Sequence, residues 1–247
     1  MNYRKEEFLI ATVAGLLDDP GVKHVAVGAA SPIPGAAALL TQARTNGRLR
    51  VSIIHGDANN PFTDGGRELF DAAGQGRIDA FFLGGVQIDG GANINLVGTG
   101  PYPETERRFS GSFGSAHMYF VIPKVILFRP EHSRRVFVEA VDFISAPGTS
   151  DPGVYRPGGP KALVTELCLM SFHADRGRFR LESVHPGHTL EEVLDNTGFD
   201  FDIPDQVPLS PEPTESDLNL LRTGIGAEIA KTYPAFGARV FAIEGAA

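Results

Sequence analysis

A dense polar segment follows the second strand-like run of the chain. Residues 55–59 read His-Gly-Asp-Ala-Asn, which sets an imidazole, a carboxylate and an amide around one glycine. Such a set can move a proton, orient a water molecule or bind a polar substrate. An Asx-rich turn that caps the following helix would contain the same residue types. We treat His55, Asp57 and Asn59 as candidate catalytic residues, with the turn as the alternative.

A second candidate segment is rich in glycine and follows the third strand-like run. Residues 84–95 read Gly-Gly-Val-Gln-Ile-Asp-Gly-Gly-Ala-Asn-Ile-Asn, and such glycines allow the backbone to approach a ligand and donate N–H groups to an oxyanion. A hairpin turn at 89–91 would also explain them. Residues 109–117 add small residues and a histidine, either to the same site or to a surface loop. The candidate substrate-binding residues are Gly84, Gly85, Gln87, Asn93, Gly114, Ser115 and His117.

Several kinds of site are not indicated by the sequence. It contains no paired cysteines, no His-x-x-x-His, no Walker A sequence and no Gly-x-Ser-x-Gly, so we expect neither a metal nor a bound cofactor. The single cysteine, Cys168, lies in an apolar run that indicates a buried, unreactive thiol. We interpret His24, His132 and His173 as structural residues.

Apolar periodicity in the first half indicates an α/β fold that could position these segments. The predicted elements are a helix that ends near Asp18, a strand at 25–27, a helix from Pro32, a strand at 51–54, a helix at 67–73 and a strand at 80–83. This order predicts an open, mainly parallel sheet with helices on both faces. In such a sheet the ligand lies beyond the carboxyl ends of the strands, where both candidate segments begin.

The second half contains further strand-like runs and two helix starts. The predicted strands are at 125–128, 136–144, 162–164 and 167–172. Helices are predicted to begin at Thr189 and near Thr214, because Glu192 and Asp217 have capping-box spacing. We expect a single domain over residues 1–247, with a proline-rich C-terminal arm and a helix at about 203–230.

Composition narrows the class of protein. A chain of 247 residues with 42% hydrophobic residues can bury a full core. The net charge of −8 argues against a general nucleic-acid partner, and no apolar run reaches the length of a membrane span. The N-terminus becomes acidic at Glu6 and Glu7, where a signal peptide would become apolar. We expect a cytoplasmic protein with neither a nucleic-acid nor a membrane partner.

Several segments, in the same order, resemble class I coenzyme A transferases, and in particular beta subunits of the glutaconate type. Residues 83–95 resemble the family's Gly-Ala-x-Gln-Ile-Asp … Gly-Asn-Ile-Asn loop, and residues 134–148 resemble its Arg-Phe-Val-Glu-x-Val-Asp-Phe-x-Thr-x-Pro-Gly stretch. Further similar blocks are at 109–116, 159–165 and 183–193. The resemblance implies an open α/β fold, an acyl-CoA ligand, and a homologous alpha subunit that shares the active site.

The sequence departs from the family pattern after the second strand. Glutaconate-type subunits carry a Glu-Ser-Gly-like segment there, whose glutamate attacks the thioester and forms an enzyme-bound glutamyl-CoA. In this chain His55 stands about where that glutamate is expected. An imidazole cannot form the same intermediate, and Asp57 lies two residues further on.

With this departure, the sequence most resembles the beta subunit of actinobacterial steroid-ring hydrolases, which open the last ring during cholesterol breakdown. The resemblance implies retro-Claisen-type hydrolysis of a cyclic β-keto acyl-CoA, with coenzyme A as part of the substrate. It also implies a glutamate base on the alpha subunit, in an αβ heterodimer or an α2β2 heterotetramer. Two alternatives stay open. One is a glutaconate- or 3-oxoacid-type transferase that uses Asp57 or a partner residue as nucleophile, and the other is a silent subunit that only positions its partner.

Overall fold

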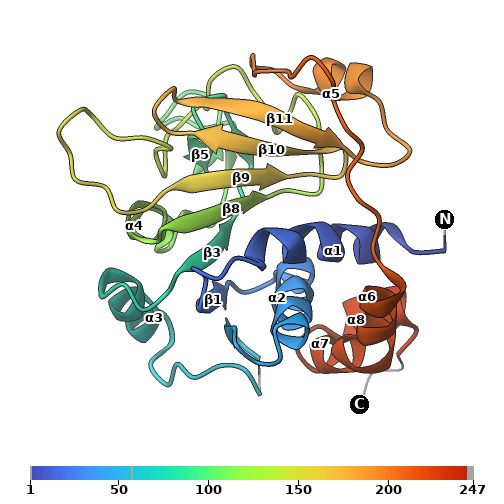
Figure 1. The fold of residues 1–247 in the computed structure, drawn as a ribbon. Helices are drawn as coiled ribbons and strands as arrows, with labels where there is room; N and C mark the ends of the chain where they lie inside the picture. The colour runs from blue at the N-terminus through green and yellow to red at the C-terminus, as the bar shows by residue number, and fades with distance from the viewer. Residues whose placement is uncertain (1, 57, 244–247) are drawn as a thin grey trace. The chain divides into compact units, whose positions relative to one another are not determined.

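The computed structural model describes residues 2–56 and 58–243. The chain divides into two compact units (Figure 1). The first unit contains the residues up to 72, residues 77–82 and the residues from 211 onward, and the second contains residues 73–76 and 83–210. This division into units does not test the expectation of a single domain over residues 1–247, which stays a prediction.

The first unit contains three parallel strands in the order β3-β1-β2. They are β1 (His24–Val27), β2 (Arg50–Ile53) and β3 (Ala80–Leu83). β1 pairs with β2 from His24–Arg50 to Val27–Ile53. Every residue of β1 is buried, as expected for a parallel strand that is covered on both faces. The strands predicted from the apolar runs of the first half are therefore confirmed.

Helices surround these strands in the first unit. They are α1 (Lys5–Leu17), α2 (Pro32–Arg44), α3 (Gly65–Gly74), α6 (Glu215–Leu220), the π-helical turn η1 (Leu221–Ile225), α7 (Gly226–Thr232) and α8 (Pro234–Phe241). α1 packs against α2, and α2 also contacts α7. The predicted capping box of Thr214 and Asp217 is present at the start of α6. Sequence reasoning missed α8, which begins at Pro234, where proline suits the first helical turn.

The second unit contains four strands in the order β11-β10-β9-β8. They are β8 (Lys124–Phe128), β9 (Pro160–Val164), β10 (Cys168–His173) and β11 (Arg178–Val184). β8 and β9 are parallel, while β10 is antiparallel to both of its neighbours. The smaller elements are β4 (Gln87–Ile88), β5 (Ile94–Asn95), β6 (Gly98–Thr99), β7 (Arg107–Arg108), α4 (Ser115–Val121) and α5 (Leu190–Asn196). The predicted capping box at Thr189 is present at α5.

Two strand predictions for the second unit need correction. The strand predicted at 136–144 is wrong, because this stretch makes only an isolated bridge between Phe137 and Ile88. Val136 and Phe137 are buried, but the chain then turns outward and leaves Ile144 53% exposed. β11 was missed because Arg178, Arg180 and other polar residues alternate with its buried residues.

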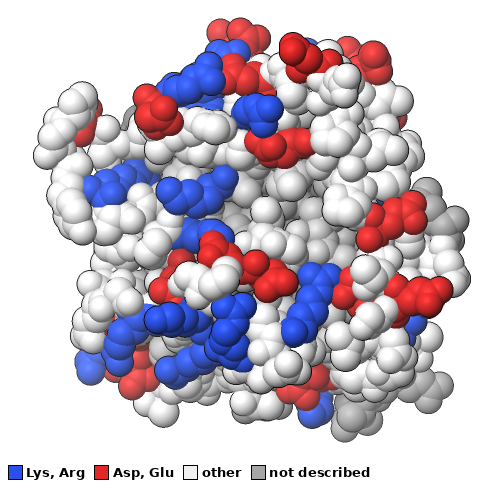
Figure 2. Space-filling view, in the orientation of Figure 1, with Lys and Arg blue, Asp and Glu red and all other residues white. Residues whose placement is uncertain are grey.

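The α/β class with a mainly parallel sheet is confirmed, with three parallel strands described in the first unit and the parallel pair of β8 and β9 in the second. Positive and negative side chains are interspersed on the face of the protein shown in Figure 2. Among the described residues, no helix combines the length and the apolar character that crossing a membrane requires.

Candidate active site

His55 lies in a strained turn directly after β2. Its φ is +67°, a left-handed conformation that is unfavourable for a residue with a side chain and is typical of functional turns. The turn closes on the strand, since the Gly56 N–H donates to the Ile53 carbonyl at 3.0 Å and the Ile53 N–H donates to the Asn59 carbonyl at 2.9 Å. The His55 side chain is exposed. The structure therefore places an accessible imidazole at the carboxyl end of β2.

Of the other two candidate catalytic residues, Asn59 has a side-chain partner on α7. Asn59 is half-buried, and its side-chain Nδ2 donates to Glu228 Oε1 on α7 at 3.2 Å. The second oxygen of Glu228 accepts from Lys231 Nζ at 2.7 Å. Sequence reasoning missed Glu228, because 169 residues separate it from Asn59. Asp57 lies outside the described residues, and its role stays a prediction.

The glycine-rich segment of the second unit forms the predicted hairpin between β4 and β5. Asp89 Oδ1 accepts from the N–H groups of Gly91 and Asn93, each at 3.0 Å. Gly85 must be glycine, since a Cβ there would lie 2.6 Å from the Gln87 carbonyl oxygen. The hairpin turn thus accounts for part of the glycine pattern, and Gly84 and Gly85 stay candidates for binding substrate through their backbone.

Both amide side chains proposed for substrate binding take part in hydrogen bonds within the second unit. Gln87 Oε1 accepts from Asn95 Nδ2 at 2.7 Å, and Gln87 Nε2 donates to Asp142 Oδ2 at 2.9 Å. Asn93 Nδ2 donates to Asp89 Oδ2 at 3.1 Å, while its Oδ1 accepts from the Gly148 N–H at 3.1 Å. These bonds hold the hairpin, so any contact of Gln87 or Asn93 with substrate would use their remaining hydrogen-bonding capacity.

The remaining candidates lie at the start of α4 in the same unit. Gly114 is the N-cap residue, and His117 is exposed one turn further along. Ser115 is buried, and its Oγ has no hydrogen-bond partner among the described residues. α4 contacts the glycine-rich segment through Tyr119, whose hydroxyl donates to the Ala92 carbonyl at 2.8 Å. The structure thus places α4 against the turn of the glycine-rich segment, and the part of Gly114, Ser115 and His117 in substrate binding stays a prediction.

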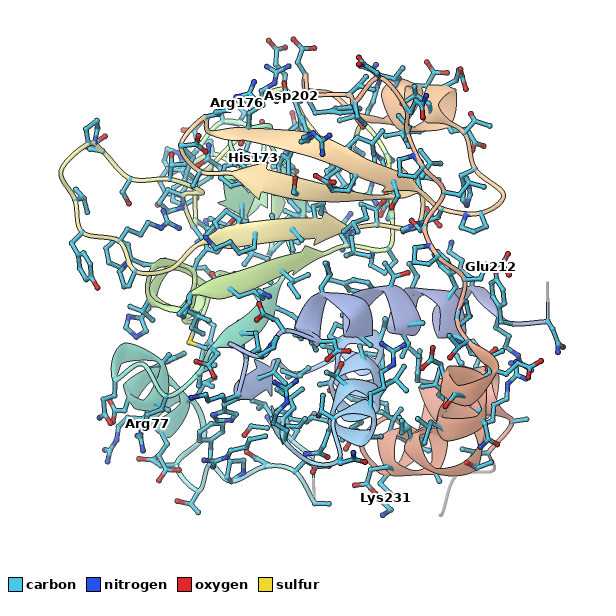
Figure 3. All side chains as sticks on the ribbon, in the orientation of Figure 1. Arg77, His173, Arg176, Asp202, Glu212 and Lys231 are labelled. Atoms are coloured by element: carbon cyan, nitrogen blue, oxygen red, sulfur yellow. The ribbon has the colours of Figure 1, made fainter. Side chains whose placement is uncertain are left out.

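The second unit also contains a cavity of about 400 Å³ beside Gly90 and Phe199. Arg176 and Arg178 line it, but Asp202 pairs with both at 2.7 and 2.8 Å. Figure 3 shows Arg176 and Asp202 next to each other at the end of the β10–β11 hairpin. Glu139 and Asp200 also line the cavity, so among the described residues three acids surround two arginines and the cavity has no excess of positive charge for an anion.

Of the histidines interpreted as structural, His24 and His132 are buried and hydrogen-bonded, whereas His173 is half-buried beside Ser171 Oγ at 3.2 Å. Burial lowers the pKa of His132 to about 4, and its ring nitrogens lie 2.8 Å from Thr165 Oγ1 and 2.9 Å from Thr197 Oγ1. In the first unit, His24 contacts Ser52 Oγ at 2.8 Å and the Arg77 carbonyl at 2.7 Å, and burial lowers its pKa. Cys168 is fully buried, and burial raises the pKa of its thiol to about 12.

Comparison with known proteins identifies relatives of this chain. The model of the coenzyme A transferase family matches residues 11–196. A 3-oxoadipate CoA-transferase subunit from Pseudomonas knackmussii is 37% identical over 153 residues, which cover 60% of this chain and 58% of that subunit. The IpdB subunit of a cholesterol ring-cleaving hydrolase from Rhodococcus jostii is 32% identical over 160 residues, covering 63% and 62% of the two chains.

The fold has a counterpart among solved structures. Rhodococcus jostii RHA1 IpdAB superposes with a TM-score of 0.78 at 26% identity, covering 90% of this chain and 94% of the other. The curated sequence relatives are matched over a shorter stretch, since the chain spans only about three fifths of their length. Residues after 196, including α6, η1, α7 and α8, lie outside the match to the family model.

Proposed function

Since the chain belongs to the coenzyme A transferase family, we propose that it is the beta subunit of an acyl-CoA hydrolase that cleaves a carbon–carbon bond. The observation that carries this proposal is His55, an exposed imidazole in the left-handed turn after β2. At about this position, family members that transfer coenzyme A use a glutamate. A histidine there cannot hold the coenzyme A thioester that a transfer mechanism requires.

The proposed substrate is a cyclic β-keto acyl-CoA, namely the last steroid ring in cholesterol breakdown. Water adds to the ring ketone and gives a tetrahedral intermediate. The bond between this carbon and the carbon next to the thioester then breaks, and its electron pair moves to that carbon as an enolate conjugated with the thioester carbonyl. A proton then adds to this carbon. The product carries one new carboxylate and keeps its coenzyme A, so no acceptor acid is consumed.

The proposal gives the chain's own residues the following roles. His55 and Asn59 orient the water or the keto group at the carboxyl end of β2. In the second unit, the backbone N–H groups near Gly84, Gly85 and Gly114 stabilise negative charge that develops on the thioester oxygen, whereas the Ser115 N–H already donates to the Ser112 carbonyl at 2.8 Å. A homologous alpha subunit supplies the general base in an αβ or α2β2 assembly. The similarity to the IpdB subunit of a ring-cleaving hydrolase supports this assignment.

A second candidate function is coenzyme A transfer between carboxylates. The similarity to a 3-oxoadipate CoA-transferase subunit favours it, with 37% identity. In this mechanism Asp57, or a carboxylate of the partner subunit, attacks the thioester and becomes the carrier of coenzyme A.

One experiment separates the two functions. The assembled enzyme is incubated with a cyclic β-keto acyl-CoA in water enriched in the heavy oxygen isotope, without an acceptor acid, and then treated with borohydride. Hydrolysis predicts a ring-opened product that carries one heavy oxygen in its new carboxylate, with both subunits unmodified. A carboxylate reduced by borohydride on either subunit, together with product only when an acceptor acid is added, would establish transfer instead.

A further inference from the structure

The loop after β2 contacts helix α7 through side chains that lie beyond residue 196, where the match to the family model ends. Glu228 accepts from Asn59 Nδ2 at 3.2 Å. A Cβ placed on Gly56 would lie 3.4 Å from Thr232 Oγ1, so the next turn of α7 lies directly against the same loop. The loop after β2 and helix α7 both belong to the first unit. One face of α7 therefore packs on the loop that carries His55 and Asn59.

The end of α7 also reaches the loop after β1. The hydroxyl of Tyr233 accepts from the Ser31 N–H at 3.4 Å. Ala30, beside Ser31, has a left-handed φ of +55°, as His55 has in the neighbouring loop. Helix α7 and the residue that caps it thus contact the loops at the carboxyl ends of two adjacent parallel strands, where an α/β sheet binds its ligand.

The chemistry of Glu228 fixes the orientation of the Asn59 amide. An ionised carboxylate only accepts hydrogen bonds, whereas an asparagine amide has a donor end and an acceptor end. Lys231 Nζ donates to Oε2 of Glu228, which leaves Oε1 for Asn59. If the amide were reversed, Asn59 Oδ1 would face a carboxylate oxygen, which is repulsive. Asn59 must therefore point its Nδ2 toward α7 and its Oδ1 away from Glu228.

We propose that Glu228 is a positioning residue that holds Asn59 with its Oδ1 as a hydrogen-bond acceptor for the attacking water. This inference rests on the proposed function. In the hydrolysis, the water that attacks the ring ketone donates one hydrogen bond to Asn59 Oδ1 while its other proton moves to the base of the alpha subunit. Lys231, which Figure 3 shows on α7, donates to the other oxygen of Glu228 and holds this carboxylate in place.

The test uses the assembled enzyme with the substitution Glu228→Gln. A glutamine can donate or accept, so Asn59 can reverse, and kcat should fall about tenfold while KM changes less than about twofold. Glu215→Gln is the matched control, since it removes an exposed carboxylate in the same unit and should leave kcat unchanged. In an Asn59→Ala background, Glu228→Gln should have no further effect, and independent, multiplicative effects would overturn the proposal.

A rescue variant distinguishes positioning from loss of packing. In the double variant Asn59→Asp with Glu228→Gln, the glutamine donates and the aspartate keeps an acceptor facing the water. Its kcat should return to within about threefold of the wild type, and failure to recover would contradict the inference.

A measurement that needs no reaction separates this inference from the proposed function. The side-chain amide resonances of Asn59, assigned with Asn59→Ala, should shift in Glu228→Gln and stay in place in Glu215→Gln. If the wild-type enzyme transfers coenzyme A instead of hydrolysing, the proposed function fails. The amide shift still reports the bond to Glu228, and an unchanged resonance would show that the bond is absent.

Discussion

Arg222 Nε lies 2.6 Å from Glu7 Oε1, and Arg222 Nη2 lies 2.9 Å from Glu7 Oε2. This bidentate ion pair joins η1 to α1 in the first unit. The Glu7 side chain is only 2% exposed, whereas that of Arg222 is 43% exposed. Burial by itself raises the pKa of Glu7, but the bonds from Arg222 and the Arg4 N–H outweigh it, so the pKa is lowered. The ion pair with Arg222 thus stabilises the charged form of the buried Glu7 carboxylate.

Arg222→Ala should therefore destabilise the chain by about 3 kcal/mol, because it leaves a buried carboxylate with the Arg4 N–H but without its charged partner. Urea denaturation measures the change. Arg135→Ala is the control, since Arg135 pairs with Glu131 at the surface with 68% of its side chain exposed, and this change should cost less than about 1 kcal/mol. Equal losses of unfolding free energy in the two variants would show that the buried pair with Glu7 contributes no more than a surface pair.

Stability should fall in mildly acidic solution because of His132 and His185. Burial lowers the pKa of each to about 4 from the usual 6.5. The unfolded chain takes up protons at a higher pH than the folded chain does, so the free energy of unfolding decreases as the pH falls from 6.5 to about 4. The loss is at most about 3 kcal/mol for each histidine.

This pH dependence can be assigned with a variant. His185→Gln keeps groups that can bond to Ser210 and to the Thr165 carbonyl, the contacts of the native ring. Urea midpoints measured at several pH values should show a shallower slope for the variant than for the wild type. If the slope does not change, His185 is not one of the groups that take up protons on unfolding.

The thiol of Cys168 should not react in the folded protein. Burial raises its pKa to about 12, so almost no thiolate exists at neutral pH. A chromogenic disulfide reagent should therefore release colour only after urea has unfolded the chain. Rapid labelling of the native protein at neutral pH would show that the second unit opens around β10.

Much of the fold could be predicted because short-range signals determine it. The capping boxes at Thr189 and Thr214 fix helix starts through contacts three residues apart, and continuous apolar runs indicate the buried parallel strands. β11 could not be recognised in the same way, since its polar face alternates with its buried one. The stretch 136–144 is apolar in composition, but its partners in space make it irregular.

The site could be predicted only in part, for a related reason. His55 and Asn59 follow a recognisable strand, so the sequence alone indicates where they lie. The partner of Asn59 is Glu228, on a helix that meets this loop only in the folded chain. Likewise, nothing in the residues around Gln87 indicates the partners of its amide. Only the folded chain shows that they are Asn95 and Asp142. Long-range pairs of this kind leave no periodic signal.

Replacing His55 with glycine should change stability and activity in opposite directions. Glycine adopts the observed φ of +67° without strain, so the free energy of unfolding should rise by about 0.5–1 kcal/mol. With the imidazole gone, kcat/KM for the ring opening should fall about tenfold or more.

Asn46→Gly is the control for His55→Gly, since Asn46 is exposed in the same unit with a φ of +52°. It relieves the same kind of strain away from the loops after β1 and β2, so it should leave kcat/KM unchanged. Denaturation and steady-state assays of the assembled enzyme measure both effects. If His55→Gly kept the wild-type kcat/KM, the imidazole would have no part in the reaction. The chain would then be a subunit that only positions its partner.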